Sequence, residues 1–150
     1  MEDLDFVNAV FILSQIHEWR IGWFAIKSKH SGFVLDIEEG QHGANIITYE
    51  KHGGDNQLWK WKGRSIVSKL GHVLDVKDGN AEEGTNIIAW KPHGGPNQQW
   101  KMKGDKIISE FNDMALDING GSKDSNINII AWPLSSETEV DNQSWELEYE

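Results

Sequence analysis

The sequence predicts an all-β domain in which one unit of four strands occurs three times. A pattern of short elements recurs in the same order with a period of roughly 41 residues, which is typical of a repeat architecture. Each copy also contains short segments rich in β-branched and aromatic residues, separated by glycine-containing turns. The chain has 150 residues, with 15 glycines and only 3 prolines, which suits one domain with many tight turns.

Each copy of the repeat contains four elements. They are a Leu-Asp-Ile/Val triplet, an Asn-Ile-Ile triplet, an aromatic residue two positions further on, and an Asn-Gln-x-Trp sequence. The elements start at Leu35, Asn45, Tyr49 and Asn56, at Leu74, Asn86, Trp90 and Asn97, and at Leu116, Asn128, Trp132 and Asn142. The aspartates are 39 and 42 residues apart, and the Asn-Gln pairs are 41 and 45 residues apart. Such regularity indicates a triplicated unit.

Twelve segments have the composition of β-strands, four in each copy. Their ranges are 23–29, 33–37, 46–51 and 57–62, then 65–70, 73–76, 87–91 and 98–103, then 106–111, 115–118, 129–132 and 144–149. The repeated leucines, the isoleucine pairs and the tryptophans Trp59, Trp100 and Trp145 are expected to converge near a pseudo-threefold axis and form the core.

Three repeated polar and aromatic sets are candidate sugar sites. They are Asp36, Tyr49 and Asn56, then Asp75, Trp90 and Asn97, then Asp117, Trp132 and Asn142. Each aspartate follows a core leucine in a strand, so alternation turns it to the opposite face. The C–H face of a pyranose stacks on an aromatic ring, and its hydroxyls need fixed acceptors and donors. Asp and Asn also form turns, but a turn does not explain the aromatic residue in every copy.

The three units resemble those of the ricin B-type lectins, whose QxW repeats fold into a β-trefoil of three four-stranded repeats with pseudo-threefold symmetry. The resemblance covers residues 23–150, with repeats at about 23–63, 64–104 and 105–150, and leaves 1–22 as a short N-terminal extension. It implies that the aspartates, aromatic residues and asparagines contact sugar at up to three sites, with galactose- or N-acetylgalactosamine-type glycans as partners. It also implies that Gln57, Gln98 and Gln143 hold the aspartates in position.

The copies differ from one another around these sets. His52 and His93 stand in His-Gly-Gly sequences, where each either leans over the site and bonds a hydroxyl or stays exposed in a loop. The third copy has a longer loop, 134–141, without this histidine, so its site is expected to be weaker or to differ in preference. The first copy has Tyr49 in place of a tryptophan. Isoleucine replaces a polar residue of some relatives at Ile47, Ile88 and Ile130.

Composition excludes several other classes of partner. The formal net charge of −10 argues against nucleic acid and against anionic membrane surfaces. The chain has no cysteine, so disulfides and thiolate chemistry are excluded. The acidic N-terminus does not resemble a signal peptide, so a cytoplasmic location is expected by default, with release without a signal peptide as a further route. The apolar run 9–13 is far short of the roughly 20 residues of a membrane span, and no membrane insertion is expected.

Candidate catalytic chemistry is sparse, and the sequence predicts a binder and not an enzyme. It has no cysteine nucleophile, no Gly-x-Ser-x-Gly sequence and no histidine pair at metal-ligand spacing, and no cofactor or metal is expected. The pairs Glu38-Glu39 and Glu82-Glu83 are interpreted as solvated loop charges. The alternative from a different class is a β-trefoil protein-interaction module with vestigial sugar sites.

The extension 1–22 contains Phe6, Val10, Leu13 and Ile16 at helical spacing, although part of it also permits a strand. An apolar segment of this kind has to be buried. It either covers the base of the domain or pairs with a second subunit in a homodimer.

Overall fold

The computed structural model describes residues 22–136 and 141–150. Within these ranges the chain forms twelve strands and six short 3-10 turns, and no α-helix, which confirms the all-β prediction. The described residues include no helix with the length and apolar character of a membrane span. The predicted extension lies outside the described residues apart from Gly22, so its helix, arm and dimer alternatives stay predictions.

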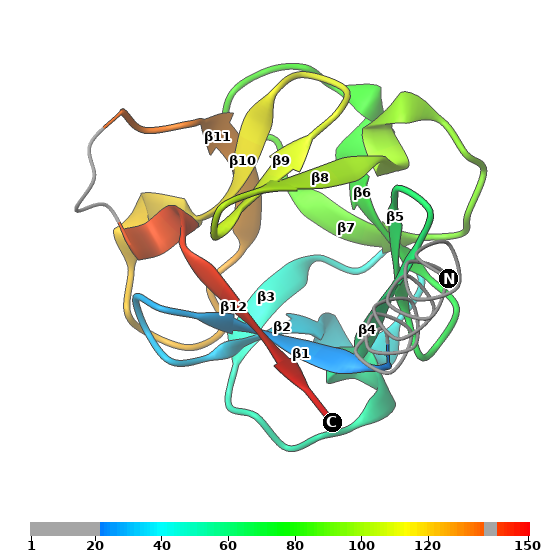
Figure 1. The fold of residues 1–150 in the computed structure, drawn as a ribbon, viewed down its shortest axis with the longest axis vertical. Coiled ribbons are helices and arrows are strands. Elements are labelled where there is room, and N and C mark those ends of the chain that lie inside the picture. The colour runs from blue at the N-terminus through cyan, green and yellow to red at the C-terminus, as the bar shows by residue number, and fades with distance from the viewer. Residues whose placement is uncertain (1–21, 137–140) are drawn as a thin grey trace, which may run out of the picture.

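The strands fall into three groups of four in chain order. They are β1 (Phe24–Ser28), β2 (Val34–Ile37), β3 (Ile46–Tyr49) and β4 (Trp59–Lys62), then β5 (Ser65–Ser68), β6 (Val73–Val76), β7 (Ile87–Trp90) and β8 (Trp100–Lys103), then β9 (Lys106–Ser109), β10 (Met114–Ile118), β11 (Ile129–Pro133) and β12 (Trp145–Tyr149). Figure 1 shows the groups arranged as three lobes around a common centre.

The first and last strands of each group form a closed barrel of six strands. β1 pairs antiparallel with β12 and meets β4, while β4 pairs with β5 and β8 with β9. One backbone hydrogen bond at each remaining junction completes the ring. The Trp100 N–H at the start of β8 donates to the Arg64 carbonyl before β5 at 2.8 Å, and the Trp145 N–H at the start of β12 donates to the Asp105 carbonyl before β9 at 2.9 Å. The pairing of β1 with β12 joins the two ends of the described fold (Figure 1).

The two middle strands of each group form a hairpin, and the three hairpins touch one another in a triangle. The hairpins are β2–β3, β6–β7 and β10–β11. Isolated bridges join them as Asn45↔Ile88, Asn86↔Ile130 and Asn128↔Ile47. Each bridge uses an asparagine and an isoleucine of two Asn-Ile-Ile elements, so this repeated sequence holds neighbouring repeats together as well as forming strands.

The core is built from the repeated apolar residues. Trp59, Trp100 and Trp145 are at most 2% exposed, and each indole N–H donates to the carbonyl of the leucine in the same repeat. Large aromatic burial of this kind, with the polar N–H satisfied, supplies much of the hydrophobic stabilisation. The three leucines and the first isoleucine of each pair are fully buried beside them.

The predicted strand boundaries were wrong at the Asn-Gln-x-Trp elements. Gln57 and Gln98 lie in 3-10 turns, η2 (Asp55–Gln57) and η4 (Pro96–Gln98), and not in strands. Their side chains bond several backbone groups across the repeat, and this network replaces the ladder hydrogen bonds that a strand would make. Strands β4, β8 and β12 therefore begin only at the tryptophan.

Candidate functional site

Each hairpin carries one aspartate on its first strand, at the place where this strand contacts the 3-10 turn that follows the hairpin (η2, η4 or, in the third repeat, η6, Asp141–Gln143). Asp36, Asp75 and Asp117 lie in β2, β6 and β10, and they are only 3%, 2% and 4% exposed. The sequence predicted that alternation turns each aspartate away from its leucine. The structure shows that the opposite face is also covered, because the 3-10 turn folds over it. The carboxylates therefore lie at the bottom of cavities and not on an open surface.

A glutamine fixes each carboxylate. Gln57 Nε2 donates to Asp36 Oδ2 at 2.8 Å and to the Glu50 carbonyl at 2.9 Å, and its Oε1 accepts from the His52 and Gly53 N–H groups. Gln98 makes the same set of bonds, with 2.8 Å to Asp75, and Gln143 lies 2.7 Å from Asp117. The amides are at most 1% exposed and already bonded, which suits a positioning role for all three glutamines.

An asparagine lies beside the other oxygen of each carboxylate. The Nδ2 atoms of Asn56, Asn97 and Asn142 are 3.2, 3.3 and 2.8 Å from Oδ1 of the aspartate of the same repeat. A carboxylate has about four lone-pair sites, so each aspartate that accepts from one glutamine and one asparagine keeps capacity for further donors. Sugar hydroxyls are donors of this kind.

Burial raises the pKa of all three aspartates above the ordinary value of 3.8. Desolvation disfavours the charged form and is the largest cause, while the bonds from the glutamine and the asparagine oppose it. His52 and His93 also lower the pKa of Asp36 and Asp75, respectively, through their charge. Three acidic groups with the same direction of shift, the same largest cause and the same glutamine and asparagine bonds indicate one type of site made three times.

Above each carboxylate lies a cavity with an aromatic wall. The cavities of the first, second and third repeats have volumes of about 340, 290 and 770 Å³. Ile47, Ile88 and Ile130 line them, which adds apolar surface where some relatives have a polar residue. Tyr49 is 39% exposed and Trp132 is 43% exposed, so each ring leaves a face available for stacking. Trp90 is half-buried, and its ring lies 4.3 Å from that of His42.

His52 and His93 lean over the first two sites. The Nδ1 atoms accept from the Gly54 and Gly95 N–H groups at 3.0 and 2.9 Å, and the Nε2 atoms lie 3.7 and 3.8 Å from Asp36 and Asp75. In a neutral ring whose Nδ1 accepts, the proton is on Nε2. The structure combines the two predicted placements, because the His52 and His93 side chains are exposed, at 48% and 43%, and each also lines the rim of its cavity.

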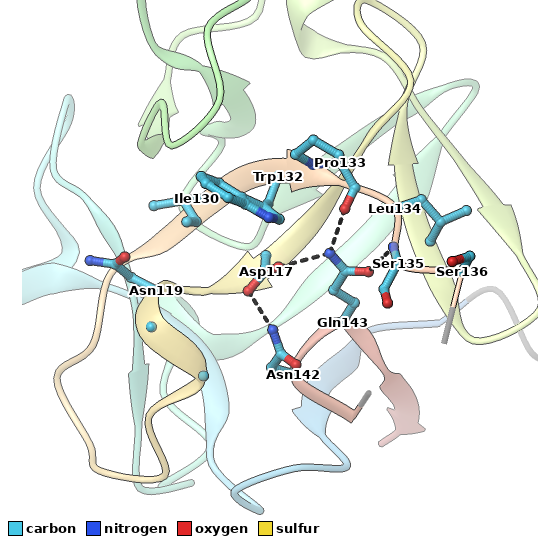
Figure 2. A pocket seen from close by; sticks show the side chains of 12 residues that line it. Asp117, Asn119, Ile130, Trp132, Pro133, Leu134, Ser135, Ser136, Asn142 and Gln143 are labelled. Atoms are coloured by element: carbon cyan, nitrogen blue, oxygen red, sulfur yellow. Dashed lines mark hydrogen bonds between the residues drawn. The ribbon is translucent and has the colours of Figure 1, made fainter. Parts of the chain in front are cut away.

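The third site has a different outer wall. Figure 2 shows Asp117 bonded to Asn142 and Gln143, with Trp132 and Ile130 beside it and the segment from Pro133 to Ser136 at the edge of the cavity. Gln143 Oε1 accepts from the Ser135 N–H at 2.9 Å, where the other repeats use the histidine backbone. The described part of this segment, Leu134 to Ser136, therefore keeps the bond to Gln143 and lines the cavity of larger volume.

The sequence interpretation missed the residues of a second 3-10 turn at each site. Glu38 and Glu39 line the first cavity, Asp78 the second and Asn119 the third. Glu38 and Glu39 are exposed, as expected for solvated charges, but they also border the site. The turns contain a left-handed residue, and glycine follows four positions after each aspartate, at Gly40, Gly79 and Gly121. That repeated glycine was the sequence signal for this turn.

Residues 22–136 and 141–150 contain no group of three or more His, Cys, Asp or Glu side chains that could hold a metal ion. The polar groups at each site are instead acceptors and donors at fixed places beside an aromatic ring. Chemically, this arrangement can accept hydroxyl protons, donate to a ring or hydroxyl oxygen, and stack on an apolar face.

Comparison with known proteins identifies the family. The family described as the ricin-type beta-trefoil lectin domain matches residues 22–145, and the chain belongs to it. This confirms the resemblance and the fold that the repeats predicted. No curated protein sequence matches the chain.

Solved structures agree with this assignment. The chain is similar to the designed 3-fold symmetric protein ThreeFoil, with 32% identity, a TM-score of 0.76 and alignment over 85% of this chain and 98% of that one. It is similar to the C-half of an earthworm R-type lectin in complex with GalNAc, with 31% identity, a TM-score of 0.70 and coverage of 86% and 99%. It also resembles part of an exo-beta-1,3-galactanase from Clostridium thermocellum, with 29% identity, a TM-score of 0.76 and coverage of 86% and 30%.

Proposed function

We propose that the chain is a lectin that binds galactose- or N-acetylgalactosamine-type glycans, using one site in each repeat. The observation that carries the proposal is the buried carboxylate held by a glutamine and an asparagine beside an aromatic wall, present three times with nearly the same bond lengths. The carboxylate takes hydroxyl protons in charge-assisted bonds, and the ring stacks on the C–H face of the sugar.

The earthworm lectin supports the choice of sugar, because it was solved with GalNAc and is 31% identical over 86% of this chain. The isoleucine side chains that line the cavities suit a ligand with an apolar face. A free hexose has donors and acceptors on every side, and a site with two or three fixed polar groups selects among them by geometry.

Three sites on one domain favour multivalent binding. A site of millimolar affinity contributes only about 4 kcal/mol, so a single contact is weak. Glycans clustered on one surface can occupy more than one site, and the second binding event then becomes intramolecular. Figure 1 shows the three repeats as separate lobes around a common centre, and each repeat has one cavity, which suits branched or densely spaced glycans.

We propose a binding role without catalysis. Cleavage of a glycosidic bond needs two carboxylates on either side of one bond, in one asymmetric site. Here each cavity has one deeply buried aspartate, and the further carboxylates, Glu38 and Glu39 in the first cavity and Asp78 in the second, are exposed and have no counterpart among the residues that line the third. The galactanase is consistent with this division of roles, because the chain corresponds to only 30% of that enzyme.

A glycan array tests the proposal, with the intact protein beside a variant in which Asp36, Asp75 and Asp117 are changed to Asn. Each replacement removes a charged acceptor for sugar hydroxyls and places the new Asn amide beside the amides of the glutamine and asparagine. The cost is about 1.5–3 kcal/mol per lost hydrogen bond. The variant is expected to lose binding to a related set of galactose-containing glycans that the intact protein retains.

A matched control changes three exposed aspartates, Asp55, Asp113 and Asp124, to Asn, which alters the net charge equally. This control should bind as the intact protein does. If the intact protein binds no glycan while thermal unfolding shows a folded domain, the lectin proposal fails and the protein-interaction alternative takes its place.

A further inference from the structure

The first cavity has a wall that comes from the third repeat. Asn126 lines it, although Asn126 follows Tyr49 by more than seventy residues in the chain. The Asn126 N–H donates to the Thr48 carbonyl at 2.6 Å, and Ile47 forms a bridge with Asn128. β3 therefore lies between β2, which carries Asp36, and the segment from Asn126 to Asn128. Asp36 and Asn126 consequently lie on opposite sides of the cavity.

The other two sites have glycine at the corresponding place. The Gly43 N–H donates to the Ala89 carbonyl at 2.6 Å, and the Gly84 N–H donates to the Ala131 carbonyl at 2.8 Å, as Asn126 does to Thr48. The φ angles of Gly43, Gly84 and Asn126 are 80°, 86° and 63°. Asparagine is one of the few residues with a side chain that adopts this left-handed conformation readily, so Asn126 occupies a glycine position.

The exchange of glycine for asparagine goes with the exchange of tryptophan for tyrosine. A Cβ added at Gly43 would lie 3.3 Å from Cζ3 of Trp90, and one added at Gly84 would lie 3.8 Å from Cζ3 of Trp132. The six-membered part of the indole thus fills the space beside the glycine. Tyr49 has a single ring and lacks the second, fused ring of an indole, and the first site presents an amide where the others present the edge of an indole.

We propose that Asn126 determines the specificity of the first site by hydrogen bonding to a polar substituent on the edge of the sugar that faces away from Asp36. The proposal rests on the proposed sugar-binding function. The amide supplies both donors and an acceptor. Its Nδ2 contacts Ser125 Oγ at 3.5 Å, the long limit of a hydrogen bond, so a ligand can displace this contact at little cost.

The chemistry that Asn126 recognises is a group with both a donor and an acceptor. Two sources provide it, the acetamido group of an N-acetylhexosamine and the hydroxyls of a second, linked sugar. A simple galactoside has only a shorter hydroxyl in place of the acetamido group, and it has no second sugar. The first site is therefore expected to discriminate among these ligands by means of a residue outside the repeated set.

The test isolates the first site by changing Trp90 and Trp132 to Ala, and it compares this background with the same protein carrying Asn126→Gly. Calorimetry measures the affinity for methyl galactoside, N-acetylgalactosamine and lactose. We expect Asn126→Gly to weaken binding of N-acetylgalactosamine or of lactose by about two- to tenfold, the effect of one hydrogen bond, and to change methyl galactoside binding by less than twofold. A loss confined to one of the two ligands identifies the source of the contact.

Asp113→Gly is the matched control, because Asp113 is exposed and also left-handed, with φ 58°. It should leave all three affinities unchanged. Equal losses for all three ligands would mean that Asn126 only maintains the position of Tyr49 in the cavity wall. No loss would show that the sugar does not reach Asn126. Either result overturns the inference. A folded background that binds none of the three ligands would refute the proposed function of the first site, and the inference with it.

Discussion

The inner and outer parts of the sites differ in how closely the repeats agree. At the inner part, the glutamine-to-aspartate bonds of the three sites are 2.8, 2.8 and 2.7 Å. At the outer part, the first site has Asn126, which comes from another repeat, and the second has His42 against the ring of Trp90. The third site has no histidine of the His-Gly-Gly type, and its cavity has a volume of about 770 Å³.

This difference has a structural cause. The inner glutamine and asparagine of the first two repeats donate to backbone carbonyls at the ends of the hairpin as well as to the aspartate, so a change there disturbs the fold and the site together. The outer residues are exposed and make few such bonds, and they can differ without cost to the core. Affinity is therefore expected to depend on the inner part in all repeats, and preference among glycans on the outer part of each.

The largest expected effect comes from Gln98→Glu. The new carboxylate keeps the bonds that Oε1 accepts but replaces the donor to Asp75 with a like charge. Loss of one hydrogen bond to a charged, buried group costs about 1.5–3 kcal/mol, so the free energy of unfolding should fall by at least this amount at neutral pH, and the second site should stop binding. Urea denaturation and calorimetry of a single-site protein measure the two effects.

Gln99→Glu is the control, since the neighbouring Gln99 is only half-buried and its amide bonds the Gly94 carbonyl. It should change the free energy of unfolding by less than about 0.5 kcal/mol. Equal behaviour of the two variants would contradict the positioning role of Gln98 and remove the distinction between inner and outer parts.

A smaller, shared effect is expected on acidification. The pKa of Asp36, Asp75 and Asp117 is raised by burial, so each protonates at a pH above 3.8 and loses acceptor capacity for sugar hydroxyls. Affinity should fall by up to about tenfold for each pH unit below the raised pKa, at all three sites alike. Calorimetry over a pH series in each single-site protein measures this.

The contribution of the same groups to stability has the opposite sign. Because the pKa is higher in the folded than in the unfolded chain, the folded state takes up protons first as the pH falls, and the cost of burying the three charges is relieved between the raised pKa and 3.8. Comparison of thermal unfolding with that of the triple Asp-to-Asn variant isolates this contribution. Binding and stability that decline in parallel through the same window, with no difference from the variant, would refute the assignment.

The smallest effect is expected for His93→Ala. The Nε2–H of His93 points toward the second cavity, 3.8 Å from Asp75, and a hydrogen bond from it to a hydroxyl is worth about 0.5–1.5 kcal/mol. Affinity of the second site should fall about two- to tenfold, and His93→Gln should restore part of it. The third site of the same protein, which has no such histidine, serves as the internal control and should not change.

Much of the fold followed from the sequence, because repetition makes each inference three times. Trp59, Trp100 and Trp145 were predicted to be buried, and the reason is visible in the pattern itself, one aromatic residue at the same place in every unit. The aspartate, asparagine and aromatic sets were predicted as neighbours, and the structure brings each set to one cavity.

What the sequence did not predict arises between elements. Asn126 approaches Tyr49 only because the hairpins of the first and third repeats meet, and no spacing within a repeat reveals that contact. The turns at Glu38 and Asp78 depend on left-handed residues whose conformation is fixed by the strands around them. The depth of the carboxylates likewise follows from how the 3-10 turn folds over the hairpin.

The pairing of β1 with β12 has a consequence for the order in which the molecule is assembled. The register joins Phe24 to Tyr149 and Ser28 to Trp145, across more than one hundred residues of chain. During synthesis, the whole of the first repeat, which carries most of the first cavity, leaves the ribosome long before Asn126 and β12 are made. Contacts of such long range make folding slow, so the earliest-made repeat waits for the latest to finish both its barrel and its cavity.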